Sequence, residues 1–382
     1  MARVVVCGYM VRYPLAGMLL AYLQYVLGLV RLGHEVLYFE ESGWDRSCYN
    51  PVDNTSTDDP DYGLTNLRNI LSSFGANPPV AYFSRQSERL YGLSWDELRD
   101  FFRHADLLLN IGGVCWTPDF LLCKRRALVD MDPFFTQIGR MGVEGFDHYD
   151  TYFSYGVNIG RPACSIPTRG IQWHPIVPPV VCDLWSNQGT PVDPSDGTRP
   201  FTTIANWSAY GGATYNGEQY GQKDVEFERM ESLPGRVSQK LELALSGAGT
   251  DTVSRLRNAG WSIRNSLDVT LKLSDYQSYI ADSRGEFSVA KNAYVKTRSG
   301  WFSDRTVCYL ASARPVVLQD SGFSDWLPTG KGVLAFRSVE EAAHCIDEVN
   351  ANYATHAQEA KNIADSIFGH QHVLTALLRT TL

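Results

Sequence analysis

The first forty residues carry the pattern of a β-strand, an α-helix and a second β-strand. Residues 3–8 are a valine-rich run that ends in glycine, which is typical of a strand buried on both faces of a parallel sheet. Residues 15–32 have apolar side chains at helical spacing and are followed by Gly33, a residue common after a helix end. Residues 35–39 predict the next strand. A βαβ unit of this kind predicts an α/β fold.

The same alternation of strands and helices is repeated on both sides of a polar segment. Residues 186–200 are nearly all turn-forming residues and predict a linker between two domains. A chain of 382 residues suits two cores better than one. We therefore expect a first Rossmann-like, doubly wound domain over 1–185 and a second over 201–352. Residues 353–382 are expected to be helical. Doubly wound sheets bind ligands at the carboxyl ends of their strands, so a cleft is expected between the domains.

The composition excludes several classes of protein. Lys and Arg number 34 against 42 Asp and Glu, so the net charge of −8 gives no broad basic surface, and we expect no nucleic-acid partner. The eight cysteines show no CxxC pair and no Cys/His cluster, which predicts reduced thiols and no metal site. The first residues lead us to expect no cleavable signal, and no apolar stretch is long enough for a membrane span. We expect a cytoplasmic protein.

The loop after the first strand does not carry a known phosphate-binding motif. Residues 8–17 lack both GxGxxG and GxxxxGK[ST], which disfavours a dehydrogenase and a P-loop enzyme. The loop nevertheless lies where a ligand would be met. Gly8 and Arg12 are therefore candidates for an acceptor or phosphate loop, and a solvated surface arginine is an equally good interpretation of Arg12.

A second candidate anion site lies in the C-terminal half. A short apolar strand leads to Lys291, and a polar loop then enters a helix near residue 303. Free backbone N–H groups at a helix N-terminus hold phosphates, and Lys or Arg side chains neutralise them. The candidate residues are Glu286, Lys291, Arg298, Ser299, Gly300, Ser303, Asp304 and Arg305. An ordinary capped helix with surface bases would explain the same pattern.

Several segments resemble bacterial GT-B glycosyltransferases, and most closely the branch described as group-1-like or CgeB-like. The segments are 299–305 (SGWFSDR), 309–317 (YLASARPVV), 319–323 (QDSGF), 33–36 (GHEV), 129–133 (VDMDP) and 155–162 (YGVNIGRP). The resemblance implies two facing Rossmann-like domains, with the acceptor held by the first and the nucleotide sugar by the second. It also implies a C-terminal helix that crosses back to the first domain. A nucleoside-diphosphate sugar is then the co-substrate, with no further cofactor.

The sequence departs from that family at two positions. Many retaining members carry two glutamates where this chain has Gly300 and Cys308. Glu286 and Asp304 are the candidates for contacts to donor hydroxyls. For a catalytic base, Asp132 follows a predicted strand end, and His148 stands in an Asp-His-Tyr-Asp segment; a turn-capping Asp and a structural His are the alternatives. A retaining enzyme would need neither residue, because the donor phosphate can act as the base.

The sequence thus predicts a metal-independent glycosyltransferase that moves a sugar to a hydroxyl of a small molecule or a glycan. A non-catalytic nucleotide- or carbohydrate-binding protein and a nucleotide-sugar epimerase on the same fold stay open. A cluster of aromatic residues among glycines either stacks on a sugar or packs locally; its members are Trp207, Tyr210, Tyr215 and Tyr220. The sugar, the nucleotide base, the acceptor, the stereochemistry and the oligomeric state are not determined by these patterns.

Overall fold

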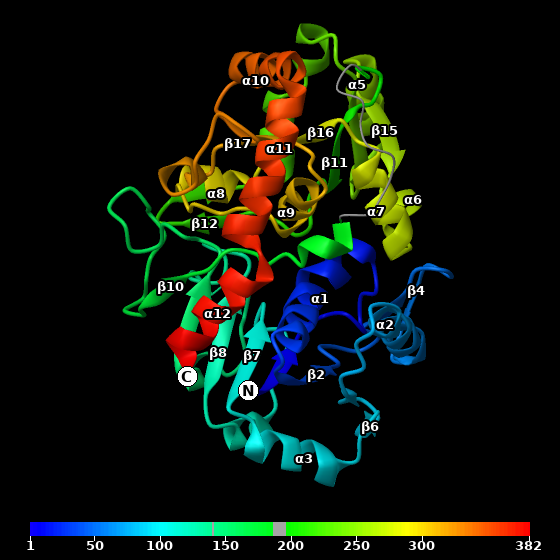
Figure 1. Ribbon diagram of the computed structural model, residues 1–382, viewed down its shortest axis with the longest axis vertical. Helices are drawn as coiled ribbons and strands as arrows, with labels where there is room; N and C mark the ends of the chain where they lie inside the picture. Colours follow the sequence, from blue (N-terminus) through cyan, green and yellow to red (C-terminus); the bar gives the residue numbers. More distant parts are fainter. Residues whose placement is uncertain (140, 186–195) are drawn as a thin grey trace.

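The computed structural model describes residues 1–139, 141–185 and 196–382. Two parallel β-sheets lie one above the other in Figure 1, each with helices on its faces. The first sheet is built by the chain up to residue 175 and the second by residues 201–336. Most of the predicted linker, residues 186–195, lies outside the described residues.

The first sheet has eight strands in the order β10-β9-β8-β7-β1-β2-β5-β6. All neighbouring strands are parallel except β5 and β6. The strands are β1 (Arg3–Cys7), β2 (Glu35–Glu41), β5 (Val80–Ser84), β6 (Arg89–Tyr91), β7 (Leu107–Ile111), β8 (Arg126–Asp130), β9 (Thr151–Ser154) and β10 (Trp173–Pro175). The helices of this part are α1 (Ala16–Arg31), α2 (Asp61–Ser73) and α3 (Trp95–His104), with 3₁₀ turns η1 (Pro118–Leu122), η2 (Phe146–His148) and η3 (Cys182–Trp185).

The first core forms because β1 is apolar on both faces. Val4 and Val6 pack toward α1, whereas Val5 and Cys7 face the layer that contains α3. The helix α1 begins and ends within one residue of the prediction and buries twelve of its sixteen residues. The helix α3 begins with a capping box: Ser94 Oγ accepts from Glu97 N–H, and Glu97 accepts from Ser94 N–H.

The second sheet has six parallel strands in the order β15-β14-β11-β16-β17-β18. Its strands are β11 (Phe201–Asn206), β14 (Leu241–Ser246), β15 (Ser262–Asn265), β16 (Gly285–Ser288), β17 (Val316–Gln319) and β18 (Val333–Phe336). Its helices are α4 (Lys223–Arg229), α5 (Thr250–Asn258), α6 (Leu267–Thr270), α7 (Leu273–Ala281), α8 (Asn292–Lys296), α9 (Asp304–Ala311) and α10 (Val339–Ala351), with 3₁₀ turns η4 (Leu233–Arg236) and η5 (Phe323–Asp325). A small hairpin joins β12 (Ala213–Tyr215) to β13 (Glu218–Tyr220). Both sheets are doubly wound, as predicted.

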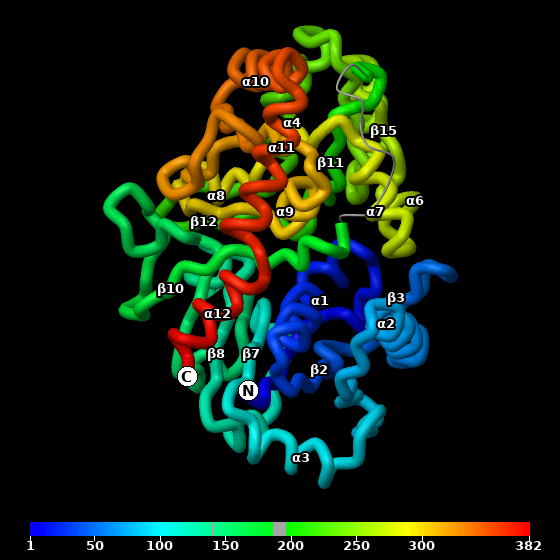
Figure 2. The backbone as a smooth tube through the Cα atoms, in the orientation of Figure 1, coloured from blue at the N-terminus to red at the C-terminus, as the bar shows by residue number. Residues whose placement is uncertain are grey.

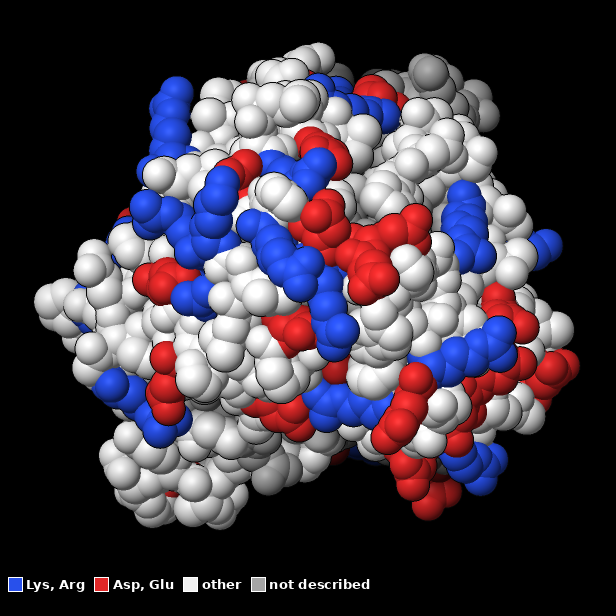
Figure 3. All heavy atoms as spheres, turned by 90° about the horizontal axis from the view of Figure 1, so that it is seen from below, with Lys and Arg blue, Asp and Glu red and all other residues white. Residues whose placement is uncertain are grey.

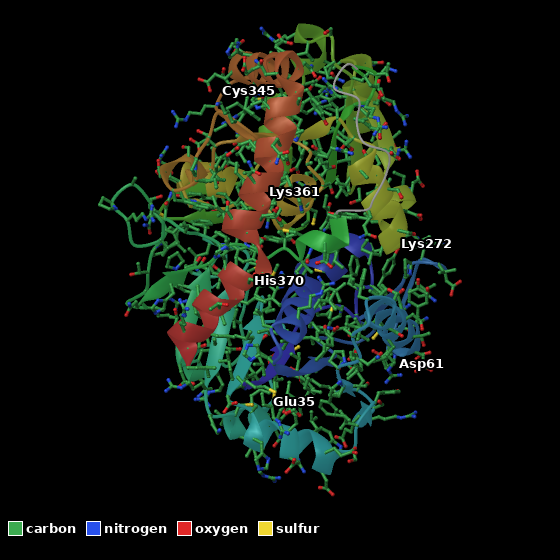
Figure 4. All side chains as sticks on the ribbon, in the orientation of Figure 1. Glu35, Asp61, Lys272, Cys345, Lys361 and His370 are labelled. Carbon is green, nitrogen blue, oxygen red and sulfur yellow. The ribbon has the colours of Figure 1, made fainter. Side chains whose placement is uncertain are left out.

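The C-terminal segment runs back from the second sheet to the first, as the tube in Figure 2 shows. It consists of α11 (Tyr353–Ile363), the π-helical turn η6 (Ala364–Phe368) and α12 (His370–Thr381). The helix α11 contacts α9, and α12 packs on α1 of the first domain. His370, labelled in Figure 4, marks the start of this contact, and a Cβ atom on Gly28 would lie 3.0 Å from its Cβ. The absence of a side chain at Gly28 therefore permits the close approach of α1 and α12.

The polar segment between β2 and α2 forms a short hairpin. Residues 45–62 contain the hairpin β3 (Cys48–Asn50) and β4 (Thr55–Thr57) and the start of α2. Each strand has only three residues, so no alternation of apolar and polar residues marks them in the sequence. In the described part of the chain, no helix has the length and apolarity that a membrane crossing requires.

Candidate functional site

The carboxyl ends of the two sheets face one another across the junction between the domains. In the first sheet the strand order reverses between β1 and β7, and in the second between β11 and β16. Helix α1, which follows β1, contacts α7 and α9 of the second domain. Ligands of doubly wound sheets bind outside such reversal points. The candidate site is therefore built from the loops that follow β1, β8, β11 and β16.

Asp132, which follows β8, is held by three side chains of the second domain. Lys291 Nζ donates to both carboxylate oxygens, at 2.9 and 2.8 Å, and also lies 2.7 Å from the Tyr210 hydroxyl. The hydroxyls of Tyr210 and Tyr294 donate to the same carboxylate. The structure thus brings two predicted site residues, Asp132 and Lys291, into one interdomain ion pair. The two tyrosines were not predicted as partners of Asp132.

Asp130, two residues earlier, fixes the loop that carries Asp132. Its buried carboxylate accepts from Ser154, Gln137 and Thr136 and from the Asp132 N–H. Burial raises the pKa of Asp130, and these hydrogen bonds oppose that rise. Asp132 is therefore presented to the second domain from a rigid turn.

A second ion pair, between Arg305 and Glu286, lies inside the second domain. Arg305 donates to Glu286 from Nε (2.7 Å), to the Ile204 carbonyl and to Ser288 Oγ. Burial alone would lower the pKa of Arg305, but Glu286, together with Tyr276 and Tyr309, offsets this effect and the pKa is raised. Glu286 Oε2 is buried and has no hydrogen-bond partner within the described chain. One predicted donor-binding pair is therefore preformed, with one carboxylate oxygen still able to accept.

Lys223, a residue that the sequence analysis missed, completes the group of cations. It begins α4, which is anchored beside β11 by a hydrogen bond from Asp224 N–H to the Trp207 carbonyl. Desolvation, together with the nearby charges of Arg305 and Lys291, lowers the pKa of Lys223 to about 7. Among the described residues Lys223 has no hydrogen-bonded or ion-paired partner. The only signal in the sequence was its position after Gly221 at the end of the aromatic segment.

The N-terminus of α9 opens into a small pocket beside these cations. Ser303 caps the helix by accepting from Arg305 N–H at 3.2 Å, and Asp304 is its first residue. Thr306 lines the pocket, and its buried Oγ1 has no hydrogen-bond partner within the described chain. The pocket is lined by Ser288, Val289, Ala290, Trp301, Phe302, Ser303, Arg305, Thr306, Leu318, Gln319 and Phe323. An unsatisfied buried hydroxyl requires a polar partner, so this pocket suits a polar ligand.

The predicted phosphate loop at 298–300 has a different role from the expected one. Its backbone N–H groups are already used: that of Ser299 donates to the Tyr294 carbonyl, and that of Gly300 to the Ser321 carbonyl. Asn158 of the first domain fills the space beside Gly300, where a Cβ would lie 2.7 Å from Asn158 Cγ. Arg298 pairs with Asp325 at 2.7 and 2.8 Å. The expectation of free N–H donors in this loop is therefore corrected: these residues join the two domains.

Gly8 and Arg12 do not reach the cleft as phosphate ligands. Arg12 is 1% exposed; its Nε donates to Glu40 and its Nη2 to the Val114 carbonyl. A Cβ on Gly8 would lie 2.6 Å from the Tyr22 ring. Gly8 permits the approach of α1 to the sheet, and Arg12 fixes the loop from inside. Neither alternative considered for Arg12, a ligand contact or a solvated surface side chain, describes this burial.

His148 is not brought to Asp132. It lies in η2, just before β9 begins at Thr151, and therefore near the amino end of the strand rather than the carboxyl end. Its ring stacks on Trp116 with centroids 5.2 Å apart. Its carbonyl accepts from Arg126, the first residue of β8. Sequence proximity to the acidic residues misled the prediction, because the strand separates His148 from the carboxyl edge.

The aromatic residues of the glycine-rich segment mainly pack. Tyr220 contacts the Phe134 ring at 4.2 Å and Trp207 stacks on Phe227 at 5.5 Å. Tyr210, by contrast, belongs to the Asp132 cluster. Of the two interpretations left open for this segment, packing describes most of its rings.

A larger pocket lies between the domains at the carboxyl ends of β14 and β15. The first domain contributes Tyr13, Leu15 and Tyr49. The second contributes Leu245, Ser246, Gly247, Ala248, Val253, Arg257, Ile263, Arg264, Asn265, Ser266 and Leu267. The described residues hold no group of three or more His, Cys, Asp or Glu side chains that could bind a metal ion.

No family model and no curated protein sequence matches this chain. Solved structures match it over nearly its whole length. An α-glucosyltransferase in complex with UDP-glucose and DNA containing an abasic site aligns at 11% identity with a TM-score of 0.59, covering 99% of this chain and 98% of that chain. Anabaena HepE, in complex with UDP and glucose, aligns at 12% identity with a TM-score of 0.57, covering 100% of this chain and 99% of that chain. AviGT4, a glycosyltransferase involved in avilamycin A biosynthesis, aligns at 12% identity with a TM-score of 0.55, covering 100% of this chain and 97% of that chain.

Identities this low establish a common fold and leave the activity to the chemistry of the site. Two doubly wound parallel sheets whose carboxyl ends face each other are the architecture that these structures share with the present chain. The chain therefore has the GT-B fold of glycosyltransferases, with two facing Rossmann-like domains.

Proposed function

We propose that this protein transfers a sugar from a nucleoside-diphosphate sugar to an acceptor hydroxyl in the interdomain cleft. The observation that carries the proposal is the convergence of Lys223, Lys291 and Arg305 beside the N-terminus of α9, at the reversal point of the second sheet. Cations and a helix N-terminus stabilise a diphosphate and the charge that develops when it leaves. The solved α-glucosyltransferase and HepE were both obtained with UDP or UDP-glucose, which makes UDP the first nucleotide to test.

Each part of the donor has a candidate binding region in this proposal. The pocket at the ends of β14 and β15 would take the nucleoside, as the corresponding edge does in doubly wound nucleotide-binding sheets. The diphosphate would lie against Lys223, Lys291 and the N-terminus of α9. Glu286 Oε2 and Thr306 Oγ1, both unsatisfied within the described chain, would meet hydroxyl groups of the donor. No cofactor or metal takes part in this proposal.

Asp132 remains the proposed base, with one condition. Its carboxylate is bound to Lys291, Tyr210 and Tyr294, so it can accept a proton only if these donors move to another acceptor. A donor diphosphate would compete with Asp132 for Lys291. Donor binding would thereby release the base on the side of the cleft where the first domain presents the acceptor. His148 has no role in this proposal.

The first test is the thermal shift of the purified protein with UDP, dTDP, GDP, CDP and ADP and their sugars, with Lys291→Met as the variant. Stabilisation by one nucleotide that is strongly reduced in Lys291→Met would support the donor site. Lys296→Met, which removes an exposed lysine paired with Glu218, is the matched control. No stabilisation by any nucleotide at millimolar concentration would contradict the proposal.

A second measurement separates the proposal from its alternatives. Slow hydrolysis of the preferred nucleotide sugar, or transfer from it, would distinguish a transferase from a non-catalytic binding protein. Conversion of the free nucleotide sugar to an epimer, with no acceptor present, would identify an epimerase. Asp132→Asn should lower turnover by at least about 100-fold if the carboxylate is the base.

A further inference from the structure

Four aromatic rings form a row on the loops that follow β1 and β2 and on the hairpin strand β3. Their order is Trp44, Tyr9, Tyr13 and Tyr49, with successive centroids 6.2, 6.2 and 5.1 Å apart. The planes of Tyr9 and Tyr13 differ by 22° and those of Tyr13 and Tyr49 by 23°. We call these four side chains the aromatic row. Segments separated in the sequence therefore present one continuous line of rings.

The buried Arg12 holds the aromatic row in place. Its guanidinium carbon lies 4.2 Å from the Tyr9 ring centroid, and its backbone carbonyl accepts from the Tyr49 N–H at 2.7 Å. Glu40 forms an ion pair with Arg12, and both side chains are fully buried. A row fixed by a buried ion pair and a cation–π contact is preorganised and loses little conformational entropy when a ligand binds.

The aromatic row leads from the interdomain pocket to solvent. Tyr13 and Tyr49 line the pocket at the ends of β14 and β15. Tyr9 is half-buried, and Trp44 at the outer end is 59% exposed. A large exposed indole in line with three partly exposed phenols is a surface feature typical of ligand binding.

The segment that carries the outer end of the aromatic row is acidic. Residues 42–62 contain five aspartates and a single basic residue, Arg46, whose Nε donates to the Ser56 carbonyl. Acidic side chains gather in Figure 3 on the side of the molecule that carries α2 and the β3–β4 hairpin in Figure 1. Such a surface repels a nucleic-acid backbone, whereas carboxylates and phenol groups accept hydrogen bonds from sugar hydroxyls.

We propose that the aromatic row binds a neutral oligosaccharide, which is the acceptor of the transfer. A pyranose presents an apolar C–H face about as wide as a phenol ring, and successive sugar units can stack on successive rings. The choice of acceptor rests on the proposed function, because Tyr13 and Tyr49 at the inner end of the row line the pocket assigned there to the nucleoside, so that a saccharide stacked farther out on the row would lie next to the donor. The saccharide-binding site itself rests only on the four rings and the charge around them.

Calorimetric titration of the whole protein with cellotetraose, maltotetraose and chitotetraose tests this proposal. At least one should bind, and Trp44→Ala should weaken that binding about fivefold, since stacking on one aromatic ring is worth about 1 kcal/mol. Trp95→Ala, which removes an indole from a separate pocket of the same domain, should leave it unchanged. The proposal is overturned if none of the three binds at millimolar concentration, or if Trp44→Ala has no effect. It is also overturned if a single-stranded DNA oligonucleotide binds to the row in place of the saccharides.

The UDP thermal shift keeps this result separate from the proposed function. Trp44→Ala should keep the full UDP shift, because the exposed indole lies outside the pocket assigned to the donor. Saccharide binding without any nucleotide shift would contradict the proposed transferase and leave the saccharide site supported. A thermal shift with UDP but no saccharide binding would contradict only the proposal that the aromatic row is the acceptor site.

Discussion

The residue with the most informative charge is Lys223, whose pKa of about 7 lies far below the value of a free lysine. In the free protein its ammonium is therefore lost as the pH rises through 7. A diphosphate beside it favours the protonated form, so nucleotide binding above pH 7 should take up a proton. We expect the dissociation constant for UDP to rise by up to about tenfold per pH unit above pH 7. Titrations at several pH values in two buffers of different ionisation enthalpy would measure this uptake.

Lys223→Met should remove that pH dependence and weaken UDP binding. The variant should also raise the free energy of unfolding by about 1–3 kcal/mol at pH 6, because a lysine with a lowered pKa destabilises the fold while it is protonated. The destabilising effect shrinks as the pH rises from 7 toward the pKa of the unfolded chain, so the gain should be smaller at pH 9. Lys296→Met is the control and should change neither quantity. An unchanged UDP affinity in Lys223→Met would remove Lys223 from the donor site.

Arg12 supports a prediction about stability rather than binding. Arg12→Met leaves the Glu40 carboxylate buried without its cation, which should cost about 3–5 kcal/mol in unfolding free energy. Arg3→Met, which breaks the exposed pair with Glu35, should cost less than about 1 kcal/mol. Chemical denaturation followed by circular dichroism compares the two. Combining Arg12→Met with Glu40→Gln should restore part of the loss. If Arg12→Met and Arg3→Met lost equal amounts of unfolding free energy, the buried pair would not hold the loop.

At the scale of elements, the loop at 298–300 can be tested through its contact with Asn158. Gly300 has φ of +75° and no room for a Cβ beside Asn158, so Gly300→Ala should lower the melting temperature by several degrees. Asn158→Ala removes the overlapping side chain but also its hydrogen bonds to Arg298 and Gly322. The double variant should therefore be more stable than the sum of the single losses predicts. Strict additivity would show that backbone strain alone determines the cost.

The same loop shows how far the sequence could predict the site. Periodicity and turn residues predicted the βαβ start and the two α/β domains, because these features depend on neighbouring residues. The role of Ser299 and Gly300 in joining the two domains depends on their contact with Asn158, which lies about 140 residues away in the chain. A single sequence does not reveal that contact. His148 was misplaced for the same reason, since the direction of β9 decides which edge of the sheet it occupies.

Lys223 and the aromatic row illustrate a second limit. Lys223 became a candidate only when α4 placed it near Arg305 and Lys291, and no local motif marks that approach. The rings of Trp44, Tyr9 and Tyr49 come from three separate segments, one of them in a hairpin too short and polar to be recognised. Secondary structure that depends on contiguous patterns was predictable, whereas side-chain arrangements assembled by tertiary contacts were not.

At the scale of the whole molecule, the contacts between the domains decide when the cleft can close on a donor. Asp132→Asn weakens the ion pair with Lys291 and frees that lysine for an anionic ligand. We expect the radius of gyration in solution to increase without nucleotide, because the variant loses an interdomain contact, and we expect UDP to bind more tightly. Small-angle scattering with and without UDP, together with calorimetry, measures both effects. Glu218→Gln, which weakens a surface pair inside the second domain, is the control. A variant that keeps the wild-type radius and binds UDP more weakly would show that Asp132 supports the donor site instead of competing with it.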